Sequence, residues 1–343
     1  MMTVLYVREP GAVVRREAER VEVTHTDPKT RRAHVLSALP IHEIEQVVLF
    51  GNVQLTTQAA ALLLQHEIDV IFLSQSGGYR GRLQKDGSKL AQLRHKQLRA
   101  ADDARAALRL AISIVQAKLN HQRILLELLS EQVDAKLAKS FTAAAMGVAQ
   151  MGRSVSSASS LDAARGFEGK GSALYFGALR VLLAPAWSFE GRKYYPPPDP
   201  FNSLLSFGYA LLQKDIESTV QRVGLDPYVG ALHTLEAGRP SLVLDLMEEF
   251  RPLVVDYAML DLVLRGKIAP QEFTFTGRRE RPVEIGERLM PRVVEAYEAR
   301  ANDVVAHKPS GARQRLRYCY ELQTRAYARV VNGDQAAFVG VLA

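Results

Sequence analysis

The sequence predicts an α+β fold, in which a small β-rich region (residues 1–84) precedes a larger all-helical region (residues 85–343). Two observations predict this arrangement. Before residue 84, short runs of β-branched and aromatic residues alternate with turn residues such as Glu9-Pro10-Gly11. Beyond it, Ala, Leu, Arg and Gln predominate, and apolar residues recur at steps of three, four and seven. The length of 343 residues also favours two domains, because single cores rarely exceed about 300 residues.

The β-rich region contains several predicted strands and one predicted helix. The helix runs from Thr56, whose hydroxyl can cap its first turn, to Gln65. Its predicted buried side consists of Ala60, Leu63 and Leu64. The glycine pair at 77–78 predicts a tight turn into the last strand. The predicted strands are Thr3–Val7, Val21–Thr24, Ala33–Leu36, Gln46–Phe50, Val70–Leu73 and Tyr79–Gln84.

Positive charge is concentrated at the start of the helical region. The whole chain has 44 Lys and Arg against 37 Asp and Glu, a net charge of +7. The stretch Lys85–Arg123 alone holds nine Lys and Arg against three Asp. A solvated helix face is the commoner explanation of such a run. The alternative is a track that contacts DNA phosphates, for which Arg94, Lys96 and Arg99 are the candidates.

Several classes of protein are excluded by what the sequence lacks. No apolar stretch reaches the roughly 18 residues of a membrane span, and the first residues do not form a signal peptide. A single cysteine, Cys319, excludes an intramolecular disulfide and a cysteine-cluster zinc site. The sequence has neither a Walker loop nor a nucleophile elbow. We therefore expect a protein of a reducing cytoplasm with no membrane partner.

Two acids and a histidine in the helical region are candidates for chemistry. Pro240 can occupy the first turn of a helix, which places Asp245 and Glu248, three residues apart, on one face. Glu249 then points elsewhere. His233 lies 15 residues before Glu248, across a glycine, so a turn can bring its imidazole back towards that carboxylate.

A third acid, Glu168, has to arrive from a separate helix. The start of that helix is predicted at Gly166, and its inner face at Leu174 and Phe176. Two carboxylates and an imidazole form a ligand set for Mg²⁺ or Mn²⁺, which retain waters and take substrate phosphate. Such a cation neutralises charge that develops on phosphorus. On spacing alone, a solvated acidic pair and a structural histidine are the commoner explanation.

At these residues the sequence resembles the CRISPR-associated integrase (endonuclease) family of spacer acquisition. Three stretches around the candidate residues carry the resemblance: GFEGKGSALYF, GLDPYVGALH and SLVLDLMEEFRP. Two further ones are NSLLSFGYALL and IEQVVLFGNVQLTTQAAALLLQHEIDVIFLS. The resemblance implies that Glu168, His233 and Glu248 bind one metal ion. It also implies that Asp245, one helical turn before Glu248, lies beside the metal and orients the cluster or a water.

The resemblance also implies an activity and partners. Family members join short foreign DNA fragments into the repeat array, by attack of a free 3′-hydroxyl on a phosphodiester at the edge of a repeat. Many also cleave branched or single-stranded DNA. The implied assembly is a homodimer formed through residues 1–84, with a metal-binding catalytic domain at residues 85–343 and a small ferredoxin-like partner protein. The arm Tyr79–Gln84 offers an edge that a second copy can pair with.

Two other functions are compatible with the same residues. One is a structure-selective DNA repair nuclease that does not integrate, and the other is a catalytically inactive DNA-binding scaffold. The presence of all the expected ligands argues against the scaffold, whereas an assay has to separate nuclease from integrase. Arg239 and Arg251 are candidate phosphate clamps. For them the alternative is a surface salt bridge with Glu236 or Glu249.

Overall fold

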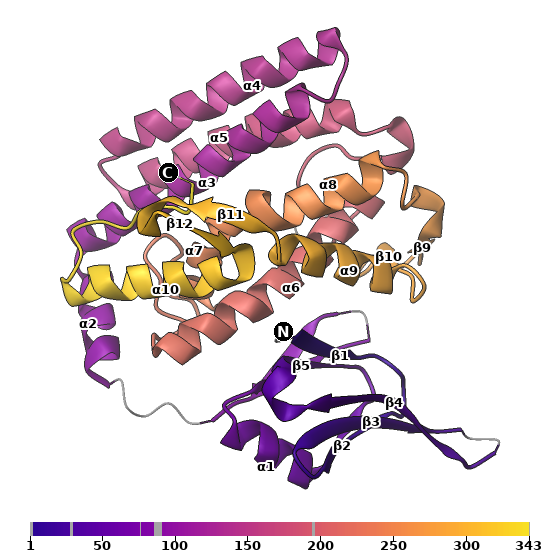
Figure 1. The fold of residues 1–343 in the computed structure, drawn as a ribbon. Coiled ribbons are helices and arrows are strands. Elements are labelled where there is room, and N and C mark those ends of the chain that lie inside the picture. The colour runs from indigo at the N-terminus through magenta and orange to yellow at the C-terminus, as the bar shows by residue number, and fades with distance from the viewer. Residues whose placement is uncertain (1–2, 28–29, 76, 86–90, 194–195, 343) are drawn as a thin grey trace. The chain divides into compact units, whose positions relative to one another are not determined.

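The chain divides into two compact units, residues 1–87 and residues 88–343 (Figure 1). The predicted boundary after residue 84 falls three residues before this division. The computed structural model describes residues 3–27, 30–75, 77–85, 91–193 and 196–342. Residues 86–90 of the basic stretch Lys85–Arg123 therefore lie outside the described part of the chain.

The amino-terminal unit contains two four-stranded sheets. In the first, β1, β5 and β7 are parallel and β8 is antiparallel to β7, in the order β1-β5-β7-β8. These strands are Thr3–Val7, Ile44–Phe50, Asp69–Leu73 and Tyr79–Leu83. The second sheet has the order β4-β3-β2-β6, with only β2 and β6 parallel. Its strands are Ala33–Pro40, Arg20–Thr26, Val13–Glu17 and Gln54–Leu55.

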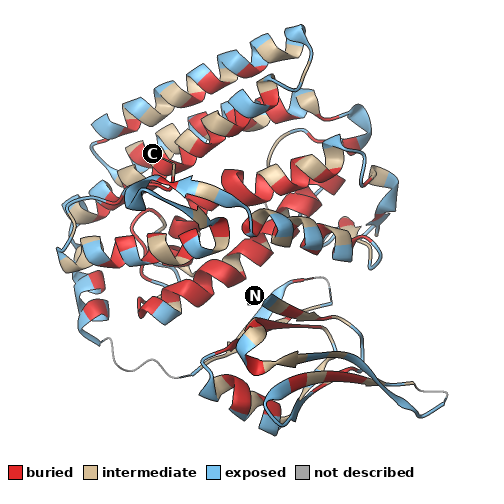
Figure 2. Cartoon of the chain, in the orientation of Figure 1, coloured by how far each residue is buried: buried red, intermediate tan, exposed pale blue. Residues whose placement is uncertain are grey.

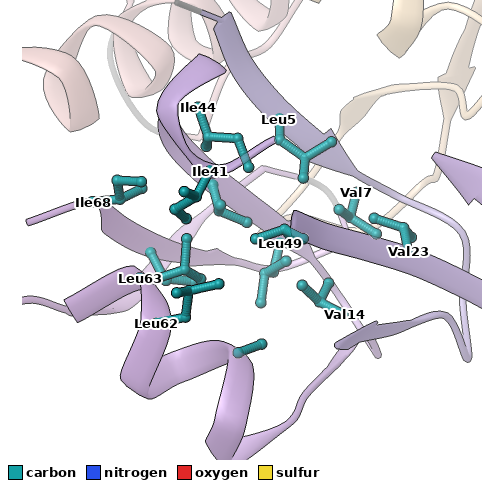
Figure 3. Packing of buried hydrophobic residues seen from close by; sticks show 14 of the residues in the cluster. Leu5, Val7, Val14, Val23, Ile41, Ile44, Leu49, Leu62, Leu63 and Ile68 are labelled. Carbon is teal, nitrogen blue, oxygen red and sulfur yellow. The ribbon is translucent and has the colours of Figure 1, made fainter. Parts of the chain in front are cut away.

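Apolar side chains from both sheets and from helix α1 (Thr57–Gln65) form the core of this unit (Figure 3). Leu5 and Val7 of β1 meet Leu49 of β5 there, because alternate residues of a strand face the same side. The Thr56 hydroxyl caps α1 by accepting a hydrogen bond from the Ala59 amide at 3.3 Å, as predicted.

The predicted buried side of α1 is one position out of register. The buried residues are Ala59, Leu62 and Leu63 instead of Ala60, Leu63 and Leu64. Three consecutive leucines allow either face to be apolar, so the helical period alone does not choose between them. All six predicted strands are confirmed, but β2 and β6 were not predicted. The sequence of β2, VVRRE, has only one buried side chain, so it lacks the apolar signal of a strand.

The second unit is mainly helical, which confirms the predicted α+β class. Its helices are α2 (Ala91–Asp102), α3 (Ala104–Ser130), α4 (Ala135–Ser154), α5 (Leu161–Leu182), α6 (Pro200–Val223), α7 (Ser241–Phe250), α8 (Tyr257–Leu264), α9 (Met290–Ala301) and α10 (Leu316–Asn332). A π-helical segment, Arg251–Asp256, joins α7 to α8. Helices α3, α4 and α5 lie side by side, and α6 and α7 are almost wholly buried (Figures 1 and 2).

The prediction of an all-helical second region needs a correction. Two antiparallel strand pairs lie within it, β9 with β10 and β11 with β12. These strands are Phe273–Phe275, Val283–Ile285, Val304–His307 and Ala312–Arg315. They are three or four residues long, too short for a two-residue period to stand out from helical patterns. Among the described residues, no helix combines the length and apolarity needed to cross a bilayer.

Helix α5 begins earlier than predicted and buries a different face. Ser160 caps it by accepting a hydrogen bond from the Ala163 amide, so Gly166 lies inside the helix and does not start it. Leu174 is 42% exposed, which contradicts the predicted inner face, and Tyr175 is fully buried. A serine at the end of a serine-rich stretch is itself a signal for a helix start. The prediction placed the start at Gly166 instead.

Close packing of α6 on the π-helical segment gives a test of the fold. A methyl group on Gly208 would lie 2.5 Å from Val255 Cγ1, and the branched Val255 side chain is fully buried. We expect Gly208→Ala to lower the free energy of unfolding by about 1–3 kcal/mol in urea titrations. The control is Gly177→Ala on α5, where nothing lies within 4 Å, and it should raise stability by about 0.5–1 kcal/mol. Wild-type stability of Gly208→Ala would contradict this packing.

Candidate active site

The three predicted metal ligands line one cleft of about 380 Å³ in the helical unit. Glu168 comes from α5, Glu248 from α7, and His233 from the loop between α6 and α7. The other lining residues are Lys118, Arg165, Leu232, Thr234 and Arg239. Side chains from three helices and a loop therefore meet here, although Glu168 and Glu248 are far apart in sequence.

Asp245 lies beneath the cleft and holds the histidine loop on α7. Its carboxylate is fully buried and accepts hydrogen bonds from the amides of Ala231 (2.6 Å), Leu232 (2.9 Å) and His233 (2.9 Å). The same carboxylate lies 2.6 Å from Nδ1 of the His233 ring. Pro240 precedes the first residue of α7, one position earlier than predicted, and Asp245 and Glu248 share a face as expected.

This arrangement fixes the orientation of the imidazole. When Nδ1 donates to the Asp245 carboxylate, Nε2 carries the lone pair of the neutral ring. Nε2 lies 3.9 Å from Glu248 Oε1, so its lone pair is directed towards the cleft and the second carboxylate. The turn that was predicted to bring His233 back to Glu248 is therefore present.

Glu248 is a buried carboxylate with cations on several sides. Burial acts to raise its pKa, but chiefly Arg251 and Lys118 lower the pKa of Glu248 to about 2. Arg251 Nη2 lies 3.5 Å from Oε1, and the Lys118 ammonium lies 2.5 Å from Oε2. Oε2 accepts no hydrogen bond of normal geometry in the described structure. The carboxylate is thus ionised at neutral pH and has an oxygen directed at a cation.

Lys118 on α3 completes the cleft and was not among the predicted residues. Its Nζ forms ion pairs with both Glu168 and Glu248, although only 7% of its side chain is exposed. Burial acts to lower the pKa of Lys118, but the two carboxylates outweigh it and raise the pKa above its usual value. The sequence does contain a signal, since Lys118 occupies the buried stripe of α3 between Val115 and Gln122. A cation on such a stripe needs acidic partners.

Arg165 joins the helix of Glu168 to the histidine loop and was also missed. Its guanidinium donates two hydrogen bonds to the Leu232 carbonyl oxygen, at 3.0 and 2.6 Å, one residue before His233. It also pairs with the exposed Asp162 at 2.9 Å. Arg165 lies one helical turn before Glu168, so α5 is tied to the loop close to the cleft.

A second polar network borders the cleft and contains the segment NSLLSFGYALL. Asn202 is fully buried and accepts a hydrogen bond from Arg192, whose guanidinium lies 5.2 Å from the centre of the Tyr209 ring. Arg251 lies 4.8 Å from the same ring. The Tyr209 hydroxyl donates to Asp256, where burial raises the pKa to about 6. The asparagine and tyrosine of this segment therefore position two arginines beside the cleft.

The proposed phosphate contacts on α2 have structural partners. Arg94 Nε donates to the carbonyl oxygen of Gly224, the residue that ends α6, at 3.1 Å. Lys96 Nζ donates at 3.4 Å to the carbonyl oxygen of Asn332, the last residue of α10. Cations at helix carboxyl ends satisfy free carbonyls and the helix dipole. Arg99 is exposed. Part of the basic charge on α2 therefore serves the fold.

The two predicted clamp arginines differ in their surroundings. Arg239 lines the cleft and forms a 2.9 Å salt bridge with the exposed Glu236, one of the predicted alternatives. Arg251 contacts Glu248, not Glu249. Glu249 is turned away from the cleft, as predicted, and accepts hydrogen bonds from Gln323 and the Val341 amide.

The residues of the cleft fit a divalent cation in donor chemistry. Among the described residues, no three His, Cys, Asp or Glu side chains are close enough to form a ready metal site. The Lys118 ammonium pairs with both Glu168 and Glu248 and supplies positive charge there. Two carboxylates that face a cationic group, and Nε2 of a ring whose Nδ1 contacts Asp245, match the oxygen and nitrogen ligands of Mg²⁺ or Mn²⁺.

Comparison with known proteins agrees with this architecture. Residues 5–299 match the model of the family described as CRISPR associated protein Cas1. A CRISPR-associated endonuclease Cas1 of Moorella thermoacetica is 31% identical over 346 residues, which cover 99% of this chain and 98% of the relative. A solved CAS1 protein from Thermotoga maritima has a TM-score of 0.79 at 22% identity and covers 98% of this chain and 99% of its own.

Two further solved structures share the fold. A casposase bound to integration product has a TM-score of 0.83 at 20% identity and covers 98% of this chain and 93% of its own. A chain of a Cas6-RT-Cas1–Cas2 complex has a TM-score of 0.79 at 20% identity, with coverage of 99% of this chain and 36% of that chain. The β-rich unit followed by a helical unit is therefore a fold that this chain shares with these structures, and the sequence matches place it in the class of CRISPR-associated endonucleases.

The family follows from the sequence matches. The family model covers most of the chain, and the Moorella relative is 31% identical over almost all of it. The chain therefore belongs to the Cas1 family, and the resemblance found in the sequence is confirmed.

The hydrogen bonds of Asp245 give a test of the site's construction. Asp245→Asn replaces an acceptor oxygen by a donor that faces amide donors, so we expect the free energy of unfolding to fall by about 2–3 kcal/mol. The matched control is Glu236→Gln, which removes an exposed salt bridge and should change stability by less than about 1 kcal/mol. Urea unfolding measures both. Equal stability of the two variants would show that Asp245 does not hold the loop.

Proposed function

We propose that this protein is a divalent-metal-dependent DNA integrase and endonuclease of CRISPR adaptation. In this reaction a 3′-hydroxyl of a short DNA fragment attacks a phosphodiester at the edge of a repeat, and a new 3′-hydroxyl leaves. The observation that carries the proposal is the convergence of Glu168, His233 and Glu248 on one cleft around a position that already holds a cationic group. Family membership and the structural likeness to a casposase bound to integration product support it.

The three converging side chains would hold Mg²⁺ or Mn²⁺. The bound metal supplies positive charge that stabilises the attacking and leaving oxygens of the transferred phosphate. The chain's own residues do the rest. Asp245 keeps the His233 ring in one tautomer and orientation, so that Nε2 faces the cleft. Arg165 and Arg239 line the cleft and provide donors that match phosphate oxygens.

Two alternatives use the same residues. A structure-selective repair nuclease needs the same metal and phosphate geometry, and differs only in using water in place of a 3′-hydroxyl. Strand transfer to a repeat-containing plasmid distinguishes the two. An inactive DNA-binding scaffold is disfavoured, since the buried carboxylates of Asp245 and Glu248 have a cost in desolvation that a scaffold has no reason to retain.

The proposed assembly has two parts. The first is a homodimer formed through the β-rich unit, whose sheets have the exposed edge strands β1, β8, β4 and β6. The second is double-stranded DNA with a small ferredoxin-like partner protein, and the presence of a similar fold in a Cas6-RT-Cas1–Cas2 complex supports a protein partner. We also place the protein in a prokaryotic cytoplasm, where the repeat array is found.

Substitution of the proposed ligands tests the function. We expect Glu168→Gln, His233→Ala and Glu248→Gln each to reduce strand transfer by about 100-fold or more, because loss of one ligand empties a weakly held cation site. The assay uses a 3′-hydroxyl donor, a supercoiled repeat plasmid and Mn²⁺. The control is Glu236→Gln, an exposed acid outside the cleft lining. Wild-type rates in any ligand variant would overturn the assignment of that residue.

The two kinds of arginine on α2 make a second test. Arg99→Gln should weaken binding to unrelated duplexes equally and reduce the slope of log K against log salt by about 1, because an exposed cation near phosphate releases counterions. Arg94→Gln should instead lower stability, since its guanidinium donates to the carbonyl that ends α6. Titration of a labelled duplex at several salt concentrations measures the slope. An unchanged slope for Arg99→Gln would show that Arg99 does not contact DNA and that α2 presents an ordinary solvated face.

A further inference from the structure

Lys118 occupies an unusual position for a lysine. Its side chain is 7% exposed, and its ammonium contacts one carboxylate from α5 and another from α7. A buried lysine far from any acid normally loses its proton, yet here two acids keep it charged. The ammonium is also the group that links α3 to both acidic helices at the cleft. Lys118 therefore offsets part of the negative charge of the proposed metal ligands in the described structure.

The two carboxylates that pair with Lys118 are also the proposed ligands of the divalent cation. A divalent cation bound by Glu168 and Glu248 needs their oxygens at coordination distance, and an ammonium at hydrogen-bond distance uses those oxygens already. Two cations also repel each other strongly in a buried site. Lys118 and the metal ion would therefore compete for the same carboxylate oxygens of Glu168 and Glu248. Lys118 lines the open cleft of about 380 Å³, which gives its flexible four-carbon chain room to move aside.

We propose that Lys118 is an internal counter-ion that stands in for the divalent cation, holds Glu168 and Glu248 in place before the metal binds, and lowers metal affinity by competing for them. This inference rests on the proposed metal-dependent function. Lys118 is a positioning residue in this view, because it acts through the two carboxylates. The lysine keeps the site assembled at low metal concentration, and the cation has to displace it.

Calorimetric titration with Mn²⁺ alone tests this competition in the full-length protein. Lys118→Met keeps the length of the side chain and removes its charge. We expect it to bind Mn²⁺ about tenfold more tightly than the wild type, or about 1.4 kcal/mol. Without metal the variant should melt at a lower temperature, because the two acids then lie together without the ammonium that pairs with both. Mn²⁺ should raise its melting temperature more than that of the wild type.

A buried lysine outside the cleft provides the matched control. Lys214 on α6 is fully buried and pairs with Asp215 at 2.6 Å. Lys214→Met should also lower the melting temperature without metal, but Mn²⁺ should raise it no more than in the wild type. Equal rescue of both variants by Mn²⁺ would overturn the proposal, because general stabilisation would then explain the effect.

A charge-retaining variant covers the case in which Lys118→Met does not fold. Lys118→Arg keeps the charge and offers a fork that engages two carboxylates at once, so it should bind Mn²⁺ about tenfold more weakly than the wild type. If Lys118→Met folds only with Mn²⁺, the proposal is supported. Wild-type or weaker Mn²⁺ affinity in Lys118→Met, or wild-type affinity in Lys118→Arg, overturns it.

The outcomes separate this inference from the function on which it rests. Absence of Mn²⁺ and Mg²⁺ binding by both the wild type and Lys118→Met would overturn the proposed metal site, and the competition with it. Metal binding by the wild type that is unchanged in Lys118→Met overturns only the role of the lysine. Strand transfer is not needed for either conclusion.

Discussion

The cleft depends on one buried carboxylate. Asp245 binds three consecutive backbone amides and the ring of His233, so a single side chain on α7 fixes the path of the histidine loop. The same helix carries Glu248 one turn later, and therefore the loop and the second acid are placed together. Arg165 on α5 donates hydrogen bonds to the Leu232 carbonyl oxygen of that loop and so connects α5 to it. The positions of the histidine loop, of Glu248 and of α5 at the cleft therefore all depend on Asp245 and its helix.

Neighbouring acids on α7 show how the surroundings set the charge of this site. Glu248 and Glu249 are both buried, and burial acts to raise the pKa of each. Glu248 faces Lys118 and Arg251, which lower its pKa to about 2, whereas Glu249 has only neutral donors and its pKa is raised to about 7. Adjacent residues thus differ because a helix directs them to opposite sides. Only the side that faces the cleft combines ionised acids with cations.

The sequence predicts the parts of the site that depend on local geometry. Helical spacing predicts that Asp245 and Glu248 lie on one face of a helix. A single turn of the chain before that helix is enough to bring His233 close to Glu248. Lys118 was missed because its partners come from α5 and α7, and no local pattern shows which helices meet. The spacing of residues did not predict that Glu168 lies near His233 and Glu248, whereas the resemblance to the family implied it. Leu174 was misplaced since two faces of α5 carry apolar residues, and only the packed structure shows which one is covered.

The charge balance of the cleft has a consequence for substrate binding. Arg239 pairs with Glu236, Arg251 contacts Glu248, Arg165 binds the Leu232 carbonyl, and Lys118 forms ion pairs with two carboxylates. In the described part of the chain these cations already have partners, so a phosphate has to exchange partners with them or meet additional positive charge. A divalent cation bound by the proposed ligands would supply such charge and free the Lys118 ammonium at the same place. If the proposed function holds, the cleft would then become more positive, and phosphate binding would follow metal binding.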